Sequence, residues 1–129
     1  MISKLSNGEI EVKIDNNGAQ MTSLQFVEEN TEYLWEADPD HWGRHSPVLF
    51  PIVGKLEGDQ YQLNDETFAL TQHGFARDNK FEIVSETEDQ IIYRLSSKPS
   101  TLKKYPYKFE LDISYKLEEN KVKVKYAVR

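Results

Sequence analysis

The sequence predicts an all-β fold, an antiparallel sandwich or barrel, from three observations. Apolar and polar residues alternate with a period of two in many short segments, which is typical of strands that bury one face. Polar turn residues separate these segments. Helical signals are short, because only residues 38–42 and 99–105 favour a turn of helix, the first capped by Asp38 with Pro39 in the opening position. Repeated strand–turn–strand units favour an antiparallel architecture.

Three hairpins are expected ahead of residue 100. Each consists of two alternating segments around a short polar turn, and such turns often contain residues that tolerate positive φ. The three pairs are EIEVKI and QMTSLQF around residues 15–18, DQYQL and ETFAL around residues 64–65, and KFEIVSE and QIIYRLS around residues 87–89. Many short strands joined in this way are typical of an all-β protein.

A fourth hairpin is expected at the end of the sequence, where KFELDISYKL and KVKVKYAV are joined at residues 118–120. In each segment the apolar residues share one face and the charged residues the other, as in strands with one buried and one solvated surface. The predicted inward residues are Phe109, Leu111, Ile113, Tyr115, Leu117, Val122, Val124, Tyr126 and Val128. The last strand runs to Arg129 with no following segment to cover it.

Two stretches interrupt the alternation. RHSPVLFPIVGKLEG, residues 44–58, has an apolar centre broken by prolines and a glycine. Because proline cannot donate a ladder hydrogen bond, this segment is expected to enter and leave a sheet with a kink, leaving Arg44 and Lys55 near its ends. QHGFARD, residues 72–78, combines an imidazole, a glycine, an aromatic ring and a guanidinium between two strand-like segments.

Composition narrows the functional classes. A chain of 129 residues with 38% hydrophobic and 12% aromatic residues fits one globular domain. Its net charge of -6 gives no counterion-release energy on nucleic acid, so no nucleic-acid partner is expected. Without cysteine there is no disulfide, thiol nucleophile or thiolate zinc site. The N-terminus lacks an apolar signal core, and no apolar run approaches the ~18 residues that span a bilayer, so we expect no membrane partner and a cytoplasmic location.

His41 and His45 are four residues apart, a spacing that suits two metal ligands on one helical face. Gly43 lies between them, Pro47 follows, and no glutamate stands where a zinc protease needs its base. We therefore expect capping or surface roles for these histidines, and no metal site.

His73 is the stronger functional candidate. An unperturbed imidazole titrates at about 6.5, which permits proton exchange near neutrality. Gly74 permits close backbone approach, Phe75 offers an apolar face and Arg77 a forked donor. This combination suits a polyhydroxylated ligand such as a sugar. Two alternatives stay open, an Arg77–Asp78 ion pair that only fixes the loop and a purely structural hydrogen-bonding role for His73.

The order of the motifs carries a family resemblance. PVLFPIVGKL followed by HGFARDNKFEI resembles the aldose 1-epimerase, or galactose mutarotase-like, superfamily, and most of all the bacterial branch with the LacX proteins and relatives of the hexose-6-phosphate epimerases. NNGAQMTSL resembles the opening strand pair of that family, EYLWEADPDHW the segment after it, and YPYKFELDISYKLEENKVKVKYAV its central hairpin. The resemblance covers nearly all of the 129 residues.

This resemblance implies a large antiparallel β supersandwich that interconverts the α and β anomers of an aldose, with no metal or organic cofactor. A base takes the proton of the anomeric hydroxyl while an acid protonates the ring oxygen, and the opened aldehyde closes on its other face. A positioned acid–base pair contributes about 10²–10⁴-fold. By position, His73 matches the first active-site histidine of the family, and Lys55 and Arg77 match basic sugar-binding positions. Phe75 and Trp42 are candidate walls of the pocket.

Members of that family are longer, and two key groups lie beyond the hairpin at residues 109–128. These are a second histidine, the expected general acid, and a glutamate, the expected general base. We therefore expect residues 1–129 to be a single domain, the N-terminal part of an incomplete supersandwich that is inactive alone. The uncovered last strand is then expected to favour self-association.

Three functional hypotheses follow. The parent protein is an isomerase acting on a hexose or hexose phosphate, with His73 in its pocket. Alternatively, the sandwich binds a sugar without chemistry, as a lectin does, or the polar loop only stabilises a bend. A downstream histidine and glutamate would favour the first hypothesis over the second. The third predicts that changing His73 and Arg77 lowers stability and leaves sugar binding unchanged.

Overall fold

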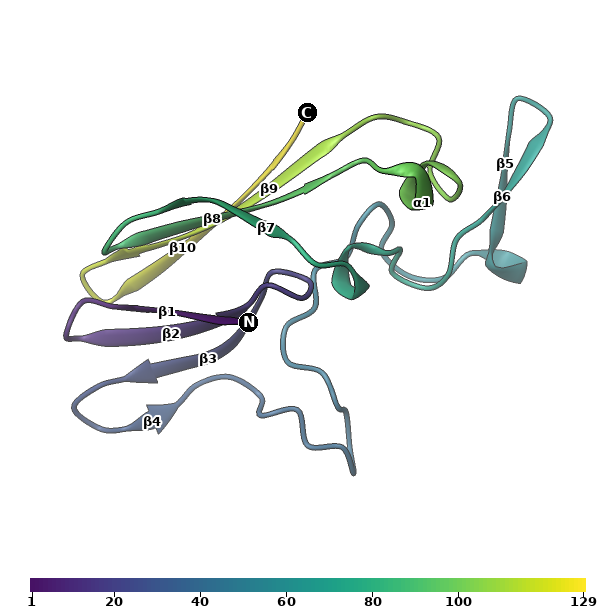
Figure 1. Cartoon of the computed structure of the whole chain (residues 1–129). Helices are drawn as coiled ribbons and strands as arrows, with labels where there is room; N and C mark the ends of the chain where they lie inside the picture. Colours follow the sequence, from purple (N-terminus) through teal and green to yellow (C-terminus); the bar gives the residue numbers. More distant parts are fainter.

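The computed structural model describes residues 1–129 and has two four-stranded antiparallel sheets, one above the other, with a separate hairpin to one side (Figure 1). The first sheet has the order β1-β2-β3-β4, and the second has the order β10-β9-β8-β7. The first contains β1 (Ile2–Ser6), β2 (Ile10–Asp15), β3 (Gln20–Phe26) and β4 (Thr31–Glu32). The second contains β7 (Glu82–Glu86), β8 (Gln90–Ser96), β9 (Glu110–Glu118) and β10 (Lys121–Val128). The other elements are the hairpin of β5 (Gln60–Leu63) and β6 (Glu66–Ala69), the 3-10 helices η1 (Glu57–Asp59) and η2 (Ala76–Asp78), and the one-turn helix α1 (Pro99–Leu102).

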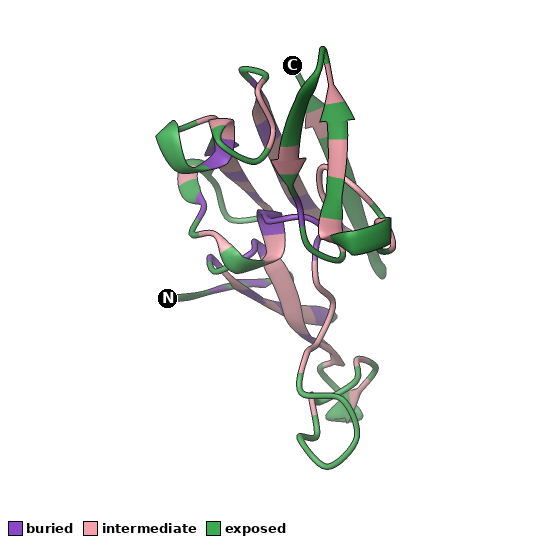
Figure 2. Ribbon diagram, turned by 90° about the vertical axis from the view of Figure 1, so that its right-hand side faces the viewer, coloured by how far each residue is buried: buried purple, intermediate pink, exposed green.

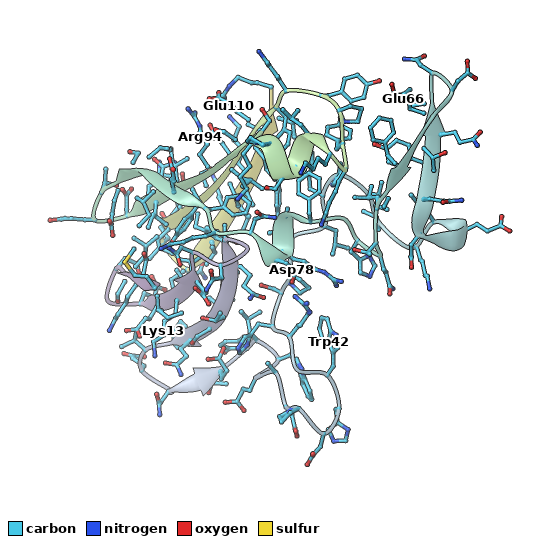
Figure 3. All side chains as sticks on the ribbon, turned by 45° about the vertical axis from the view of Figure 1, so that its right-hand side comes forward. Lys13, Trp42, Glu66, Asp78, Arg94 and Glu110 are labelled. Carbon is cyan, nitrogen blue, oxygen red and sulfur yellow. The ribbon has the colours of Figure 1, made fainter.

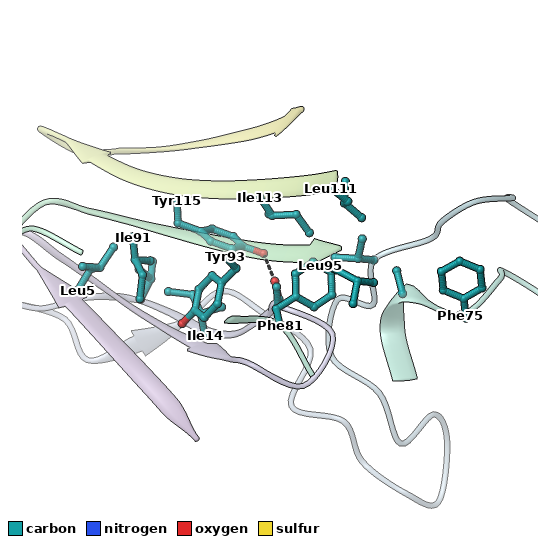
Figure 4. Packing of buried hydrophobic residues seen from close by; sticks show 14 of the residues in the cluster. Leu5, Ile14, Phe75, Phe81, Ile91, Tyr93, Leu95, Leu111, Ile113 and Tyr115 are labelled. Carbon is teal, nitrogen blue, oxygen red and sulfur yellow. Dashed lines mark hydrogen bonds between the residues drawn. The ribbon is translucent and has the colours of Figure 1, made fainter. Parts of the chain in front are cut away.

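The core lies between the inward faces of the two sheets, and the β5–β6 hairpin and the long loop after β4 are mostly exposed or half-buried (Figure 2). The core is one cluster of 18 buried residues (Figure 4). Strand alternation explains the members that lie in strands, because β9 buries every second residue from Leu111 to Leu117, and β2 and β8 alternate in the same way. The Tyr115 hydroxyl, whose pKa is raised by burial, crosses between the sheets and donates to the carbonyl oxygen of Ala19 at 2.7 Å.

The predicted all-β class and the four predicted hairpins are confirmed. The pairs β2–β3, β5–β6, β7–β8 and β9–β10 are all antiparallel. Asn64 and Asp65 adopt φ values of 50° and 63° in the β5–β6 turn, as their residue types allow. Residues 38–42 form a single turn in which the Asp38 carbonyl oxygen accepts from the Trp42 amide at 2.8 Å. No helix of the structure has the length and apolar character needed to cross a membrane.

Residues 44–56 form no regular strand. Their one β-type pairing is an isolated parallel bridge between Phe50 and Gly74, and Val48 in this segment is buried. The prediction that this segment enters and leaves a sheet is therefore wrong, since it joins no sheet and forms one isolated bridge. That bridge fixes the segment against the QHGFARD loop.

The terminal strand β10 lies at the edge of its sheet. Its inward residues Val124, Tyr126 and Val128 are 37%, 58% and 58% exposed. Their partners on β9 are Tyr115, Ile113 and Leu111, all of which are buried. The apolar face of β10 is therefore uncovered at these three positions, whereas Val122 packs against the core.

Candidate functional site

The QHGFARD loop is clamped to the kinked segment through backbone groups. The carbonyl oxygen of Phe50 accepts from the amides of Phe75 at 2.9 Å and Ala76 at 3.1 Å. Gly74 makes this approach possible, since it adopts a φ of +72° and a Cβ at its position would lie 2.2 Å from the Phe50 oxygen. Two segments with few regular hydrogen bonds of their own are thereby held together.

His73 is anchored through both its backbone and its ring. Its amide donates to the carbonyl oxygen of Gly54 at 2.8 Å, and the Gly54 amide donates to His73 Nδ1 at 3.0 Å. His73 itself has a φ of +64°, an uncommon conformation for a residue with a side chain. The imidazole therefore has a fixed orientation set by a residue 19 positions earlier.

The His73 ring forms part of the lining of a surface hollow of about 400 Å³. The complete lining is Trp42, Pro47, Leu49, Gln72, His73 and Arg77. One aromatic ring and two aliphatic side chains thus share the hollow with an amide, an imidazole and a guanidinium. Figure 3 shows Trp42 on the long loop, on the same flank of the molecule as Asp78 in η2.

Arg77 has donors that the protein does not use. Its Nε lies 3.4 Å from Asp78 Oδ2, within ion-pair distance, but makes no hydrogen bond. Asp78 Oδ1 accepts instead from Arg44 Nη2 at 2.9 Å. The local Arg77–Asp78 ion pair is present, and the carboxylate is shared between two arginines. Arg77 Nε is buried, so the donors left for an acceptor in the hollow are those of the two terminal Nη groups.

The turn between β2 and β3 packs against η2 and the residues that follow it. The Gly18 amide donates to the Asn79 carbonyl oxygen at 2.8 Å, and the Phe81 amide donates to the Asn16 carbonyl oxygen at 2.9 Å. A Cβ on Gly18, whose φ is +74°, would lie 2.7 Å from the Arg77 carbonyl oxygen. The position of Arg77 therefore depends on close packing against the N-terminal hairpin.

The structure brings three of the five predicted site residues together and places the other two elsewhere. His73, Arg77 and Trp42 line the hollow. Phe75 is buried, and its ring meets the Phe50 ring edge-on at 6.1 Å in the core. Lys55 is exposed and follows Gly54 outside the lining.

Sequence reasoning did not single out three lining residues. Gln72 lies within the QHGFARD motif and could have been found from its place next to His73. Pro47 and Leu49 belong to an apolar run whose side chains carry no signal for a polar ligand.

The histidine pair in the long loop has structural contacts. His45 Nδ1 lies 3.0 Å from the carbonyl oxygen of Trp35, and the His41 ring lies 6.2 Å from the Trp35 ring. The structure contains no group of three or more histidine, aspartate or glutamate side chains arranged to hold a metal ion.

A family model described as aldose 1-epimerase matches residues 1–129. The chain belongs to the aldose 1-epimerase family. Among curated members it is 32% identical to the chromosomal LacX protein and 31% identical to the plasmid LacX protein, both of Lactococcus lactis subsp. lactis. Each match covers 99% of this chain and 44% of the relative. The chain thus spans less than half the length of the curated relatives it matches.

Solved structures of this family share the fold. A galactose mutarotase related enzyme from Lactobacillus acidophilus is 40% identical with a TM-score of 0.97, over 99% of this chain and 43% of that one. A galactose mutarotase-like protein from Lactobacillus casei is 34% identical with a TM-score of 0.96, over 99% of this chain and 44% of that one. The predicted family resemblance and the mutarotase-like sandwich are confirmed by these matches.

Proposed function

We propose that residues 1–129 form one domain, the N-terminal part of a mutarotase-like β-sandwich that binds a hexose or hexose phosphate for interconversion of its anomers. The observation that carries this proposal is the hollow, where His73, Gln72 and Arg77 offer hydrogen-bonding groups beside the Trp42 ring. A sugar needs several donors and acceptors together with an apolar platform for its C–H faces. Membership of the aldose 1-epimerase family supports the same class of ligand.

The proposed reaction is the opening and reclosure of a pyranose ring. A base removes the anomeric hydroxyl proton, the C1–O5 bond breaks, and O5 receives a proton from an acid. Rotation about C1–C2 turns the aldehyde, and O5 attacks its other face with the proton transfers reversed. In the hollow, His73 and Arg77 would hold the sugar oxygens close to the reacting bond. The general acid and general base expected from the family lie beyond residue 128, so we expect this chain to bind and not to turn over.

A phosphorylated hexose suits the free donors of Arg77 as well as an unphosphorylated one does. A guanidinium binds phosphate through paired N–H groups. Arg44 and Arg77 share the single carboxylate of Asp78, so this group of three side chains keeps one net positive charge for an anionic ligand. Lys55 stays a predicted binding residue through its family position, although its ammonium lies outside the lining. Comparison of glucose and galactose with their 6-phosphates therefore belongs in any binding experiment.

Anomer exchange and binding can be measured in one NMR experiment. We expect no saturation transfer between the α and β anomeric protons of galactose or glucose with this chain, but broadening of the sugar lines. His73→Ala should abolish the broadening, since it removes the ring that faces the hollow. His41→Ala is the matched control, because it removes an exposed imidazole outside the lining. Exchange above the uncatalysed rate that His73→Ala abolishes would show a working acid–base pair within these residues and refute the proposed division of roles.

A second function, carbohydrate binding without chemistry, is favoured by the same lining. Its aromatic ring, amide and guanidinium are groups that bind sugars in proteins without catalysis. The distinguishing experiment adds the segment that relatives have beyond the matched part, either fused or in trans. Restored exchange would favour the isomerase, and unchanged binding without exchange would favour the binding protein.

The uncovered face of β10 leads us to propose self-association of the 129-residue chain. Its edge ladder is unpaired, and Val124, Tyr126 and Val128 expose apolar surface beside it. Sedimentation velocity at high concentration should show a dimer or larger species, and Tyr126→Glu should shift it toward the monomer. A monodisperse monomer of the parent chain under those conditions would contradict this prediction.

A further inference from the structure

The two hydrogen bonds between Gly54 and His73 determine where the imidazole carries its proton. The Gly54 amide has a hydrogen to donate and lies 3.0 Å from His73 Nδ1. A ring nitrogen that accepts a hydrogen bond carries no proton, so the neutral ring must carry its proton on Nε2. The reciprocal bond from the His73 amide to the Gly54 oxygen, at 2.8 Å, keeps the two residues in register.

His45 has the opposite arrangement in the same molecule. Its Nδ1 lies 3.0 Å from the carbonyl oxygen of Trp35, which can only accept. His45 must therefore carry its proton on Nδ1 to make this bond. The chain provides its own comparison, two histidines whose neighbours specify opposite tautomers.

Gln72 indicates what the Nε2–H of His73 meets. The Nε2 atoms of Gln72 and His73 are 3.3 Å apart, and two N–H groups cannot bond to each other. With the His73 proton on Nε2, the Gln72 amide must turn its oxygen toward the ring, and amide nitrogen and oxygen positions are interchangeable in this way. Both side chains line the hollow, so the N–H is directed to a place where an acceptor oxygen is expected.

We propose that the Gly54 amide locks His73 as the Nε2–H tautomer, making the ring a hydrogen-bond donor to an acceptor oxygen of the ligand and not a base. Gly54 is then a positioning residue that acts through the His73 ring. The ligand as an aldose rests on the proposed function, whereas the tautomer does not. In the free chain the Gln72 oxygen accepts from this N–H. A ligand oxygen with a free lone pair can replace or share that acceptor, whereas a ligand N–H or C–H group cannot.

The tautomer can be observed directly without any sugar. At a pH of about 8.5, above the range where an unperturbed imidazole is charged, ¹⁵N spectra of the labelled chain separate nitrogens with and without a proton. We expect His73 Nδ1 to be of the unprotonated type and Nε2 protonated, with a coupling across the hydrogen bond from the Gly54 nitrogen to His73 Nδ1. His45 should show the reverse pattern, and loss of signals in His41→Gln, His45→Gln and His73→Gln assigns each ring. A protonated His73 Nδ1, or the tautomer mixture of a free imidazole, would overturn the proposal.

Two amide variants test whether the donor position matters to a ligand. The side-chain NH₂ of His73→Gln can reach the place of Nε2, whereas that of His73→Asn reaches only the place of Nδ1. With galactose and glucose as probes, His73→Gln should keep affinity within about tenfold of the parent, and His73→Asn should lose it. Asparagine tolerates the φ of +64° better than glutamine, so a preference for glutamine cannot come from the backbone.

The two experiments fail independently. If neither sugar nor its 6-phosphate binds the parent chain, the proposed function is refuted, and the ¹⁵N pattern still decides the tautomer. If the sugars bind and His73→Gln is as defective as His73→Asn, the donor role is refuted even where the tautomer is as expected.

Discussion

Gly74→Ala is expected to lower the free energy of unfolding by about 4 kcal/mol and to remove sugar binding. A Cβ at this position would lie 2.2 Å from the Phe50 carbonyl oxygen and 2.5 Å from the Phe50 carbonyl carbon, which are backbone atoms with no rotamer to change. Relief of the clash must separate the two segments, and this breaks the hydrogen bonds from Phe75 and Ala76 to Phe50. The change in stability is measured by urea denaturation of the variant and the parent.

Gly8→Ala is the matched control for Gly74→Ala. Gly8 also has a positive φ, +86°, but a Cβ there meets nothing within 4 Å. The free energy of unfolding of this variant should therefore fall by about 1 kcal/mol, from conformational strain alone, and the hollow should be unchanged. If both variants lose the same free energy of unfolding, the close contact between Gly74 and the Phe50 backbone is not the reason that residue 74 is a glycine.

Phe109→Ala is the second large effect, with an expected loss of about 3–5 kcal/mol. The Phe109 ring lies 5.0 Å from Phe50 and 5.9 Å from Phe75, one from each of the clamped segments. It is buried, so truncation leaves a cavity beside the rings of Phe50 and Phe75. Urea denaturation should show a lower midpoint. The NMR chemical shifts of the His73 and Gly54 backbone amides should also change, because both segments lose the ring that they share as a contact.

Tyr107→Ala is the control for Phe109→Ala. Tyr107 is 49% exposed and belongs to the margin of the same aromatic group, with its ring 5.1 Å from Tyr105. Its loss is expected to cost about 1 kcal/mol or less and to leave the His73 and Gly54 shifts unchanged. If the two variants lose the same free energy of unfolding, the inference that the buried aromatic core supports the hollow would be wrong.

Local alternation was sufficient to predict the hairpins, but not all of the sheet. In β9, apolar residues at every second position predicted both the strand and its inward face, since each side chain reports directly on burial. β1 was not predicted, because ISKLS offers only two buried positions, Ser3 and Leu5, and one of these is polar. Its strand conformation comes from pairing with β2, which is a tertiary effect.

The sequence was sufficient to predict the motif that carries the site, but not which residues line the hollow. The residue types of QHGFARD predicted a polar loop around His73, and that loop lines a hollow. The contact from Gly54, 19 residues earlier, has no local signature, and neither do the apolar walls from the long loop. Phe75 was expected in the pocket because of its place in the motif. The left-handed conformations of His73 and Gly74 reverse the chain there, and the Phe75 ring lies in the core instead.

The contacts that join the two sheets have a consequence for folding order during synthesis. The Tyr115 hydroxyl bonds to Ala19 across 96 residues, and Asn7 Nδ2 donates to the Glu119 carbonyl oxygen at 2.7 Å across 112 residues. Such contacts have high sequence separation and form only after a large loop closes. β1, β2 and β3 leave the ribosome first, but the sheet that packs on them is complete only when β8, β9 and β10 have followed, at about 5–20 residues per second. For several seconds the nascent chain therefore carries an apolar surface with no partner, and we expect it to be most prone to aggregation in this interval.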